Sequence, residues 1–505
     1  MPIRTEILSS FYQDSVVLMR MASQIRTRPG IREAAAFMGT PSNHGLLEQI
    51  GLATAESKEA RPNDLILTVD ADSDAAAEGA LAAAKELLAQ RRQVSESAAE
   101  VRPRTLESAL RMLPDANLVA ISVPGAYAKF EAMKAIKHGL HVFLFSDNVP
   151  LQDEIELKTE ALRRGVLCMG PDCGTAYLNG TGVGFTNVVP RGRIGCVAAA
   201  GTGLQAVVSR IAALGEGISH GIGVGGRDLS AEVGGMMTLF ALEALADDPS
   251  TEAIVIISKP PHATVLPRLK AAIAKVHKPV VACVLGAKAP AESTAVWVDT
   301  LDAAADTVVA LITQRTLVRR PFSDASGIRA RLARLHASGP IAGEVLGLYT
   351  GGTLAHEAHL LLDSLLGHDA GHQILDLGDD QYTVGRPHPM IDPQTRTEMI
   401  LKAGQEKAGV LLVDLVLGRG SHPNPAAPLA GAIRQASDMA AAAGRRLVAV
   451  GSVVGTADDP QDLAGQVAQL EEAGVELLPS NAEAARFAAL LVKRALAETL
   501  LEVSR

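Results

Sequence analysis

The sequence predicts a multidomain α/β protein, in which a small α+β region precedes domains built on parallel sheets. Three observations support this fold class. The chain has 505 residues, which exceeds one ordinary core and suggests three or four domains. Hydrophobic residues make up 48% of the chain but aromatic residues only 3%, a composition typical of α/β enzymes with alanine-rich helices. From Leu118 onward, short apolar stretches alternate with helical ones, which is the spacing of βαβ units.

The N-terminal region, residues 1–102, is expected to fold as a small α+β unit. Its apolar stretches have the period of strands, and its amphipathic stretches have the period of helices. Strands are predicted at 5–9, 34–38 and 65–69, and helices at 14–26 and 74–91. The stretch 90–104 is polar and contains Pro103, so we expect a linker there.

Three α/β domains are expected after this linker, at residues 103–190, 191–320 and 340–505. In each of them a predicted helix follows almost every predicted strand, which favours parallel sheets. The strands are predicted at 118–123, 142–145, 166–169, 194–198, 221–224, 253–257, 280–285, 345–348, 410–415, 447–452 and 475–478. The arginine-rich stretch 315–340 is expected to connect the last two domains and to contain one short helix.

Charge and cysteine content exclude several classes of function. The net charge is −9 and no basic stripe is present, so nucleic acid is not an expected partner. No apolar stretch reaches the roughly 18 residues of a membrane span, and the first residues lack the pattern of a signal peptide. The four cysteines have no metal-ligand spacing, so we expect no metal site and a reducing compartment, the cytoplasm.

Glycine turns follow three predicted strands between Gly170 and Asp228. The carboxyl ends of parallel strands form the ligand crevice of an open sheet, and glycine lets backbone N–H groups approach an anion there. The turn at Gly201, Thr202 and Gly203 is expected to start a helix capped by Thr202 and to bind phosphate or carboxylate. The alternative is an ordinary tight turn between a strand and a helix.

A second turn of the same plan contains Gly351, Gly352 and Thr353. It also joins a predicted strand to a predicted helix. We therefore expect two helix N-termini from neighbouring domains to face one shared anion.

Side chains beside these turns are candidates for holding a substrate. Arg227 follows the third turn and Lys259 follows a strand, so both place positive charge near the crevice. Asp172 and Cys173, in the first turn, are candidate substrate contacts. Structural salt bridges are an equally good explanation of the charged residues.

The longest polar stretch, residues 376–393, is expected to be a functional loop. Its charges and prolines do not suit a core element, and long loops of this kind are usually functional or disordered. Arg386 offers a bidentate fork for an anion, and His388 can transfer a proton. The alternatives are a solvated loop pinned by its prolines and, for the acidic residues, Mg²⁺ binding or turn capping. The acidic residues concerned are Asp376, Asp379 and Asp380.

Residues 118–290 resemble the α subunit of succinyl-CoA synthetase and other NDP-forming acyl-CoA synthetases. The matching segments lie mostly at strand ends and glycine turns, namely 121–124, 169–174, 201–203, 223–226, 248–254 and 278–281. The resemblance implies a Rossmann-like CoA-binding-type domain at 103–190. It also implies two flavodoxin-like, succinyl-CoA synthetase-like ligase domains at 191–320 and 340–505.

Across nearly its whole length the chain also resembles the FdrA family. The segments that carry this resemblance are 11–16, 38–43, 145–149, 225–229, 348–354 and 376–393. The resemblance implies a subunit of a multi-protein carbamoyltransferase that acts on oxamate or oxalurate in purine and allantoin breakdown. Other subunits of a hetero-oligomer and a small anionic substrate are then the expected partners.

Two departures from the synthetase pattern shape the functional hypothesis. Those enzymes pass phosphate through a histidine, but this sequence has no histidine between His277 and His336. Residues 1–45 also contain no GxxGxxG turn for CoA. The FdrA resemblance makes carbamoyl transfer the first hypothesis, with Arg386 neutralising charge and His388 moving a proton. An acyl-CoA synthetase-like ligase, with CoA or a nucleotide as cofactor, and a non-catalytic scaffold subunit are the alternatives.

Overall fold

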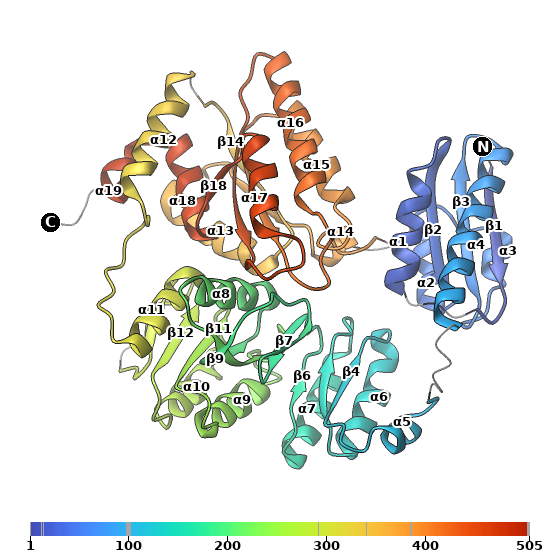
Figure 1. The fold of residues 1–505 in the computed structure, drawn as a ribbon, viewed down its shortest axis with the longest axis horizontal. Helices are drawn as coiled ribbons and strands as arrows, with labels where there is room; N and C mark the ends of the chain where they lie inside the picture. The colour runs from blue at the N-terminus through green and yellow to red at the C-terminus, as the bar shows by residue number, and fades with distance from the viewer. Residues whose placement is uncertain are drawn as a thin grey trace. The chain divides into compact units, whose positions relative to one another are not determined.

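The computed structural model describes residues 2–11, 13, 15–96, 103–290, 292–339, 341–383 and 386–501. They form two compact units (Figure 1). Met1–Pro103 and Gly378–Asp392 make up unit 1, and Arg104–Leu377 and Pro393–Arg505 make up unit 2. Both units combine helices with sheets, and the sheets of unit 2 are mostly parallel, so the predicted α/β fold class is confirmed.

Unit 1 is built on an antiparallel sheet of three strands in the order β1 (Ile3–Leu8), β3 (Leu65–Ala71), β2 (Ile31–Met38). Its two faces carry separate cores because alternate side chains of a strand point to opposite sides. In β2, Ala34, Ala36 and Met38 join one core, whereas Ala35 and Phe37 join the other. The first core also contains residues of the long helices α1 (Ser15–Arg26) and α4 (Asp74–Glu96), and α2 (Pro41–Gln49) contributes to the second.

The predicted linker at 90–104 is partly wrong, because α4 continues to Glu96. The remaining residues of that stretch up to 102 lie outside the described residues. Unit 1 also has a short helix that the sequence did not predict, α3 (Ala55–Lys58), which begins with a capping box at Thr54 and Ser57.

Unit 2 begins with a parallel sheet of three strands in the order β4 (Leu118–Ile121), β5 (His141–Leu144), β6 (Cys168–Met169). The helices of this part are α5 (Leu106–Met112), α6 (Gly125–Lys137) and α7 (Leu151–Arg164). The predicted strand–helix alternation is therefore present here, and helix 151–164 has the predicted bounds.

The central sheet of unit 2 has seven strands in the order β13-β12-β11-β9-β10-β7-β8. Five of them run parallel, while the hairpin of β7 and β8 adds an antiparallel edge. Their bounds are β7 (Thr175–Leu178), β8 (Thr181–Gly184), β9 (Arg191–Ala198), β10 (Ile218–Gly223), β11 (Ala253–Ser258), β12 (Val280–Val284) and β13 (Val296–Val298). The helices are α8 (Gly201–Ala213), α9 (Met236–Asp247), α10 (Leu266–Ile273) and α11 (Leu301–Thr313). The sequence predicted neither the hairpin nor β13.

One hydrophobic core joins the three-stranded and seven-stranded sheets. The same cluster of buried side chains contains Val142 of β5, Val197 of β9 and Ile256 of β11. The core is thus continuous across the predicted boundary between residues 190 and 191, and the four-domain division stays a prediction.

The last sheet has five parallel strands in the order β15-β14-β16-β17-β18. Their bounds are β14 (Glu344–Tyr349), β15 (Gln373–Asp376), β16 (Ala408–Val416), β17 (Val448–Val454) and β18 (Glu476–Leu478). Every residue of β16 is buried, as expected of a strand covered on both faces. The helices are α12 (Ala325–Ala337), α13 (Gly352–Leu366), α15 (Gln394–Gln405), α16 (Ala426–Ala442), α17 (Leu463–Glu472) and α18 (Asn481–Val492). The helix predicted at 482–501 breaks at Lys493, after which a 3-10 turn and α19 (Ala497–Leu501) follow.

Buried hydrogen bonds join the last two sheets of unit 2. Asn187 donates its side-chain amide to Asp459 at 2.8 Å and to the carbonyl of Leu417 at 3.0 Å. The other oxygen of Asp459 accepts the backbone N–H of Val188 at 2.7 Å. These bonds connect segments more than 200 residues apart.

Candidate functional site

The first turn of α8 has the free backbone donors that the sequence predicted. Ala200 is the N-cap, with an extended backbone and no side-chain cap, so the expected cap at Thr202 is wrong. No hydrogen bond from the backbone N–H of Gly201, Thr202 or Gly203 is found among the described residues. This turn lies at the carboxyl end of β9, and Gly201 and Thr202 are partly exposed. Free N–H groups at such a turn favour a bound anion.

The first turn of α13 packs directly against that of α8 (Figure 1). A Cβ placed on Gly203 would lie 2.8 Å from Cγ2 of Thr353. A Cβ on Gly351 would lie 3.0 Å from both Cβ and Oγ1 of Thr202. The structure therefore brings the two predicted glycine turns together, while their binding of a shared anion stays a prediction.

A carboxylate of the protein already occupies part of the α13 N-terminus. Asp414, fully buried in β16, accepts the N–H groups of Thr350 at 2.9 Å and Gly351 at 2.8 Å. Arg396 donates to Oδ1 of Asp414 at 3.1 Å. Burial raises the pKa of Asp414, and the attraction of Arg396 opposes this only in part. The N–H of Gly351 is thus committed to an internal partner.

A second carboxylate lies beside the same turn. Oδ2 of Asp376 would be 2.3 Å from a Cβ on Gly352, so the absence of a side chain there leaves room for Asp376. A further anion close to these two carboxylates would be repelled. The N–H groups of α8 have no such internal acceptor among the described residues, but Asp414 also lies near Thr202 of that turn.

Lys259 supplies positive charge near α13. It directly follows β11 and is exposed. Its charge acts on His356 of α13, whose pKa is lowered first by burial and then by Lys259. Nε2 of His356 is buried and has no hydrogen-bond partner among the described residues. His356 is a lone histidine without ligand spacing in the sequence, so sequence reasoning missed it.

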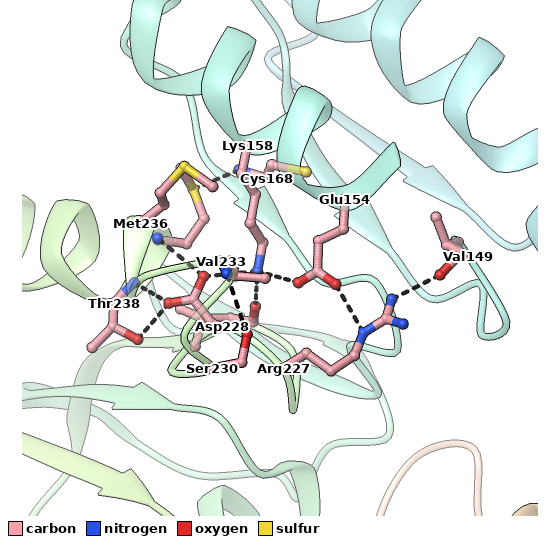
Figure 2. Close-up of polar contacts among 12 residues, drawn as sticks. Val149, Glu154, Lys158, Cys168, Arg227, Asp228, Ser230, Val233, Met236 and Thr238 are labelled. Atoms are coloured by element: carbon pink, nitrogen blue, oxygen red, sulfur yellow. Dashed lines mark hydrogen bonds and ion pairs between the residues drawn. The ribbon is translucent and has the colours of Figure 1, made fainter. Parts of the chain in front are cut away.

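Arg227 and Asp228 belong to a buried network of charges, shown in Figure 2. Lys158, with a fully buried side chain, donates to Glu154 at 2.8 Å and to Asp228 at 2.7 Å. Burial opposes the charge of Lys158, but the two carboxylates outweigh it and raise its pKa. Asp228 also accepts the N–H groups of Met237 and Thr238 and thereby caps α9.

Arg227 closes this network at its edge. Its Nε lies 2.9 Å from Glu154, and it donates to the carbonyl of Val149 at 2.8 Å (Figure 2). Arg227 therefore forms a structural salt bridge, which was the alternative explanation. About half of its side chain is exposed, at 47%, and anion binding by Arg227 stays a prediction.

The two candidate substrate contacts of the first turn differ in access. Cys173 is buried, and its thiol lies 3.5 Å from the carbonyl of Thr175. Burial raises the pKa of Cys173 to about 12, so the group is a neutral thiol. A substrate contact by Cys173 does not fit this burial. Asp172 is exposed, with a left-handed backbone at φ 54°, and its role stays a prediction.

Arg386 and His388 lie in unit 1, whereas the glycine turns lie in unit 2. Their predicted combination with those turns therefore stays a prediction. His388 accepts the N–H of Met390 at 3.2 Å, and burial lowers its pKa to about 4. Its ring is then neutral at pH 7 and a weaker base than an ordinary histidine.

The structure also assembles a group with metal-binding geometry that the sequence analysis missed. His359, Asp363 and His372 place their ligand atoms within 4.8 Å of one another. The sequence signal for this group is a histidine and an aspartate four residues apart on a helix, with a second histidine nine residues later. The expectation of no metal site overlooked this spacing.

Comparisons with known proteins identify the relatives of this chain. Residues 1–103 match the family described as "AllF, heavy metal-associated domain", and residues 348–491 match the CoA-ligase family. The protein YahF of Escherichia coli K12, which is uncharacterised, is 37% identical over 506 residues, covering 95% of this chain and 97% of YahF. The chain belongs to the YahF family.

Parts of this YahF family member also resemble enzymes. The α subunit of an ADP-forming succinate–CoA ligase from Methanothermobacter thermautotrophicus is 30% identical over 179 residues. That match covers 35% of this chain and 59% of the ligase subunit. The dinucleotide-forming acetyl-CoA synthetase 1 of Ca. Korarchaeum cryptofilum covers 76% of this chain and is itself covered to 84%, at 16% identity and a TM-score of 0.31.

The CoA-ligase family match and the succinate–CoA ligase match confirm the coarser part of the sequence-based resemblance. The YahF family member has a CoA-ligase domain and a segment like the α subunit of succinyl-CoA synthetase. The FdrA label and the carbamoyltransferase activity stay predictions. Among the described residues, no helix combines the length and hydropathy needed to span a membrane.

Proposed function

We propose that this chain is an acid–thiol ligase of the CoA-ligase type, or a subunit of one, which binds the phosphate of an activated acyl group at the first turn of α8. The observation that carries the proposal is the row of uncommitted N–H groups at Gly201, Thr202 and Gly203. Such donors stabilise negative charge as it develops on a leaving phosphate. The positive charge of Lys259 near α13 acts in the same direction.

The proposed step is attack of the CoA thiol on the carbonyl carbon of an acyl phosphate. The C–S bond forms, the bond from the carbonyl carbon to the phosphate oxygen breaks, and inorganic phosphate leaves while the thiol proton passes to solvent. This step starts from a preformed acyl phosphate and needs no phosphohistidine; because the chain has no histidine between His277 and His336, formation of the acyl phosphate falls to a partner. The CoA-ligase match at residues 348–491 and the similarity to a succinate–CoA ligase subunit support CoA as the acceptor.

Carbamoyl transfer is the second candidate, in line with the FdrA resemblance. Carbamoyl phosphate would bind to the same N–H groups. The carbamoyl group would then pass between phosphate and oxamate, with oxalurate as the carbamoylated compound, in place of the attack by the CoA thiol. The lack of a relay histidine favours this candidate as much as the first. It requires partner subunits in a hetero-oligomer. A scaffold subunit without catalysis is the third.

We also propose a cytoplasmic location. The four cysteines are free and buried in the structure, which suits a reducing compartment.

Release of inorganic phosphate separates the candidates. The full chain, alone and with copurifying subunits, is incubated with acetyl phosphate and CoA, and in parallel with carbamoyl phosphate and oxamate. The ligase proposal predicts CoA-dependent phosphate release together with thioester formation. Release that depends on oxamate and not on CoA would contradict it in favour of carbamoyl transfer. Phosphate release in neither mixture would favour the scaffold.

A further inference from the structure

The C-terminal half of α13 carries a cluster of imidazoles around one carboxylate. Asp363 lies four residues after His359 on the helix, so both side chains lie on one face. The chain then turns at Gly367 and returns towards β15, which brings His368 and His372 to the same carboxylate. This cluster lies beyond the glycine turns and takes no part in the proposed ligase chemistry.

The distances between the ligand atoms fit a single small metal ion. Nε2 of His372 lies 2.8 Å from Oδ1 of Asp363, and Nε2 of His359 lies 3.5 Å from its Oδ2. In a tetrahedral zinc site with bonds of about 2.0–2.1 Å, neighbouring ligand atoms are roughly 3.3 Å apart. All three ligand atoms lie within 4.8 Å of one another, so they must approach by up to about 1.5 Å to surround one ion.

The three side chains range from buried to partly exposed, as expected of a metal site at the protein surface. The side chain of His372 is only 2% exposed, Asp363 is 26% exposed and His359 is 44% exposed. Nε2 of His372 faces Asp363 and is the atom that would bind an ion there, while its Nδ1 is buried without a partner among the described residues.

We propose that His359, Asp363 and His372 bind a divalent transition-metal ion of the zinc type. Two imidazoles and a carboxylate are ligands that Zn²⁺ prefers, and water is free to fill a fourth position on the exposed side. His368, whose Nδ1–H donates to Oδ2 of Asp363 at 3.1 Å, orients the carboxylate from outside the ligand set. The ion connects the last turns of α13 with the residue before β15 and clamps the intervening turn.

The test uses the full chain without a polyhistidine tag. The protein is stripped with a chelator, and Zn²⁺ binding is measured by competition with a chromogenic chelator and by metal analysis after dialysis. The expected result is one Zn²⁺ per chain and a raised thermal midpoint. The variant H359A is expected to lose at least tenfold in affinity, since His359 is a direct ligand.

His359 is the variant of choice because its side chain is partly exposed and its loss leaves the core intact. The matched control is H277A, which removes an exposed histidine far along the chain from the cluster. D363N, which keeps the size of the side chain but removes its charge, is expected to weaken binding like H359A. The proposal is overturned if the wild-type chain binds no Zn²⁺, or if H359A and H277A bind it equally with circular dichroism spectra like that of the wild type.

Discussion

Thr353 of α13 stands against Gly203 of α8 so closely that a Cβ on the glycine would lie 2.8 Å from the threonine Cγ2. The helix that follows β9 of the seven-stranded sheet and the helix that follows β14 of the five-stranded sheet therefore contact each other at their first turns. The contact depends on a residue without a side chain, because a methyl group at this place has no room. This junction positions the free N–H groups of α8.

The variant G203A is expected to destabilise the chain by about 1–3 kcal/mol, since the new methyl group must displace Thr353 or shift a helix. Urea unfolding measures this change. The matched control is G431A, in α16, where a Cβ would meet nothing within 4 Å. That substitution is expected to be neutral or to stabilise by roughly 0.5–1 kcal/mol through higher helix propensity. Equal stability of both variants would contradict the close contact.

Lys158 holds two buried carboxylates, so its loss is expected to be costly. The variant K158M keeps much of the volume but leaves Glu154 and Asp228 without their buried cation. We expect a loss of about 3–5 kcal/mol in the free energy of unfolding.

The control for K158M is K129M, which removes a lysine from ion pairs that are partly exposed. Such pairs contribute about 0–1 kcal/mol. A loss in K158M no larger than in K129M would show that the buried network in Figure 2 does not stabilise the fold.

Glu357 gives the stability of the chain a pH dependence of known sign. Burial, with a smaller contribution from Asp302, raises the pKa of this carboxyl from 4.5 to about 7. Between these values the folded chain keeps a proton that the unfolded chain has lost, so stability falls as the pH rises. A shift of this size corresponds to on the order of 3 kcal/mol.

The variant E357Q removes the titrating group but retains an oxygen for Leu301 or Asn481. Unfolding by urea at pH 5 and pH 8 should therefore show a smaller difference in the variant than in the wild type, by about the same 3 kcal/mol. Identical pH profiles for the two proteins would exclude a raised pKa for Glu357. The absolute stability of E357Q does not enter the comparison.

The fold was predictable wherever local sequence and tertiary environment agree. Strands such as β11 and β16 are largely apolar because helices cover both faces of their sheets. The hairpin of β7 and β8 escaped prediction because both strands are short and β8 contains two glycines. Helix α15 escaped because its sequence is largely polar and follows a proline.

The site was predictable only where its chemistry is local in sequence. The glycine turns at Gly201 and Gly351 could be recognised because strand, glycine and helix follow one another. Asp414 is a single charged residue in an otherwise apolar strand. Its role could not be predicted, because it accepts the N–H of Gly351, which lies 63 residues earlier in the chain. The burial of Cys173 and the partners of Arg227 likewise come from the tertiary structure.

One pair of variants tests directly whether the N–H groups of α8 bind the phosphate of a substrate. G201P removes one N–H at the first residue of the helix, where proline fits, and the extended Ala200 before it accepts a following proline. G201A adds a side chain but keeps the N–H. Calorimetric titration with acetyl phosphate should give similar affinities for the wild type and G201A. The affinity of G201P should be lower by up to about tenfold. Equal affinities for G201P and G201A, or no binding by any of the three proteins, would contradict the claim.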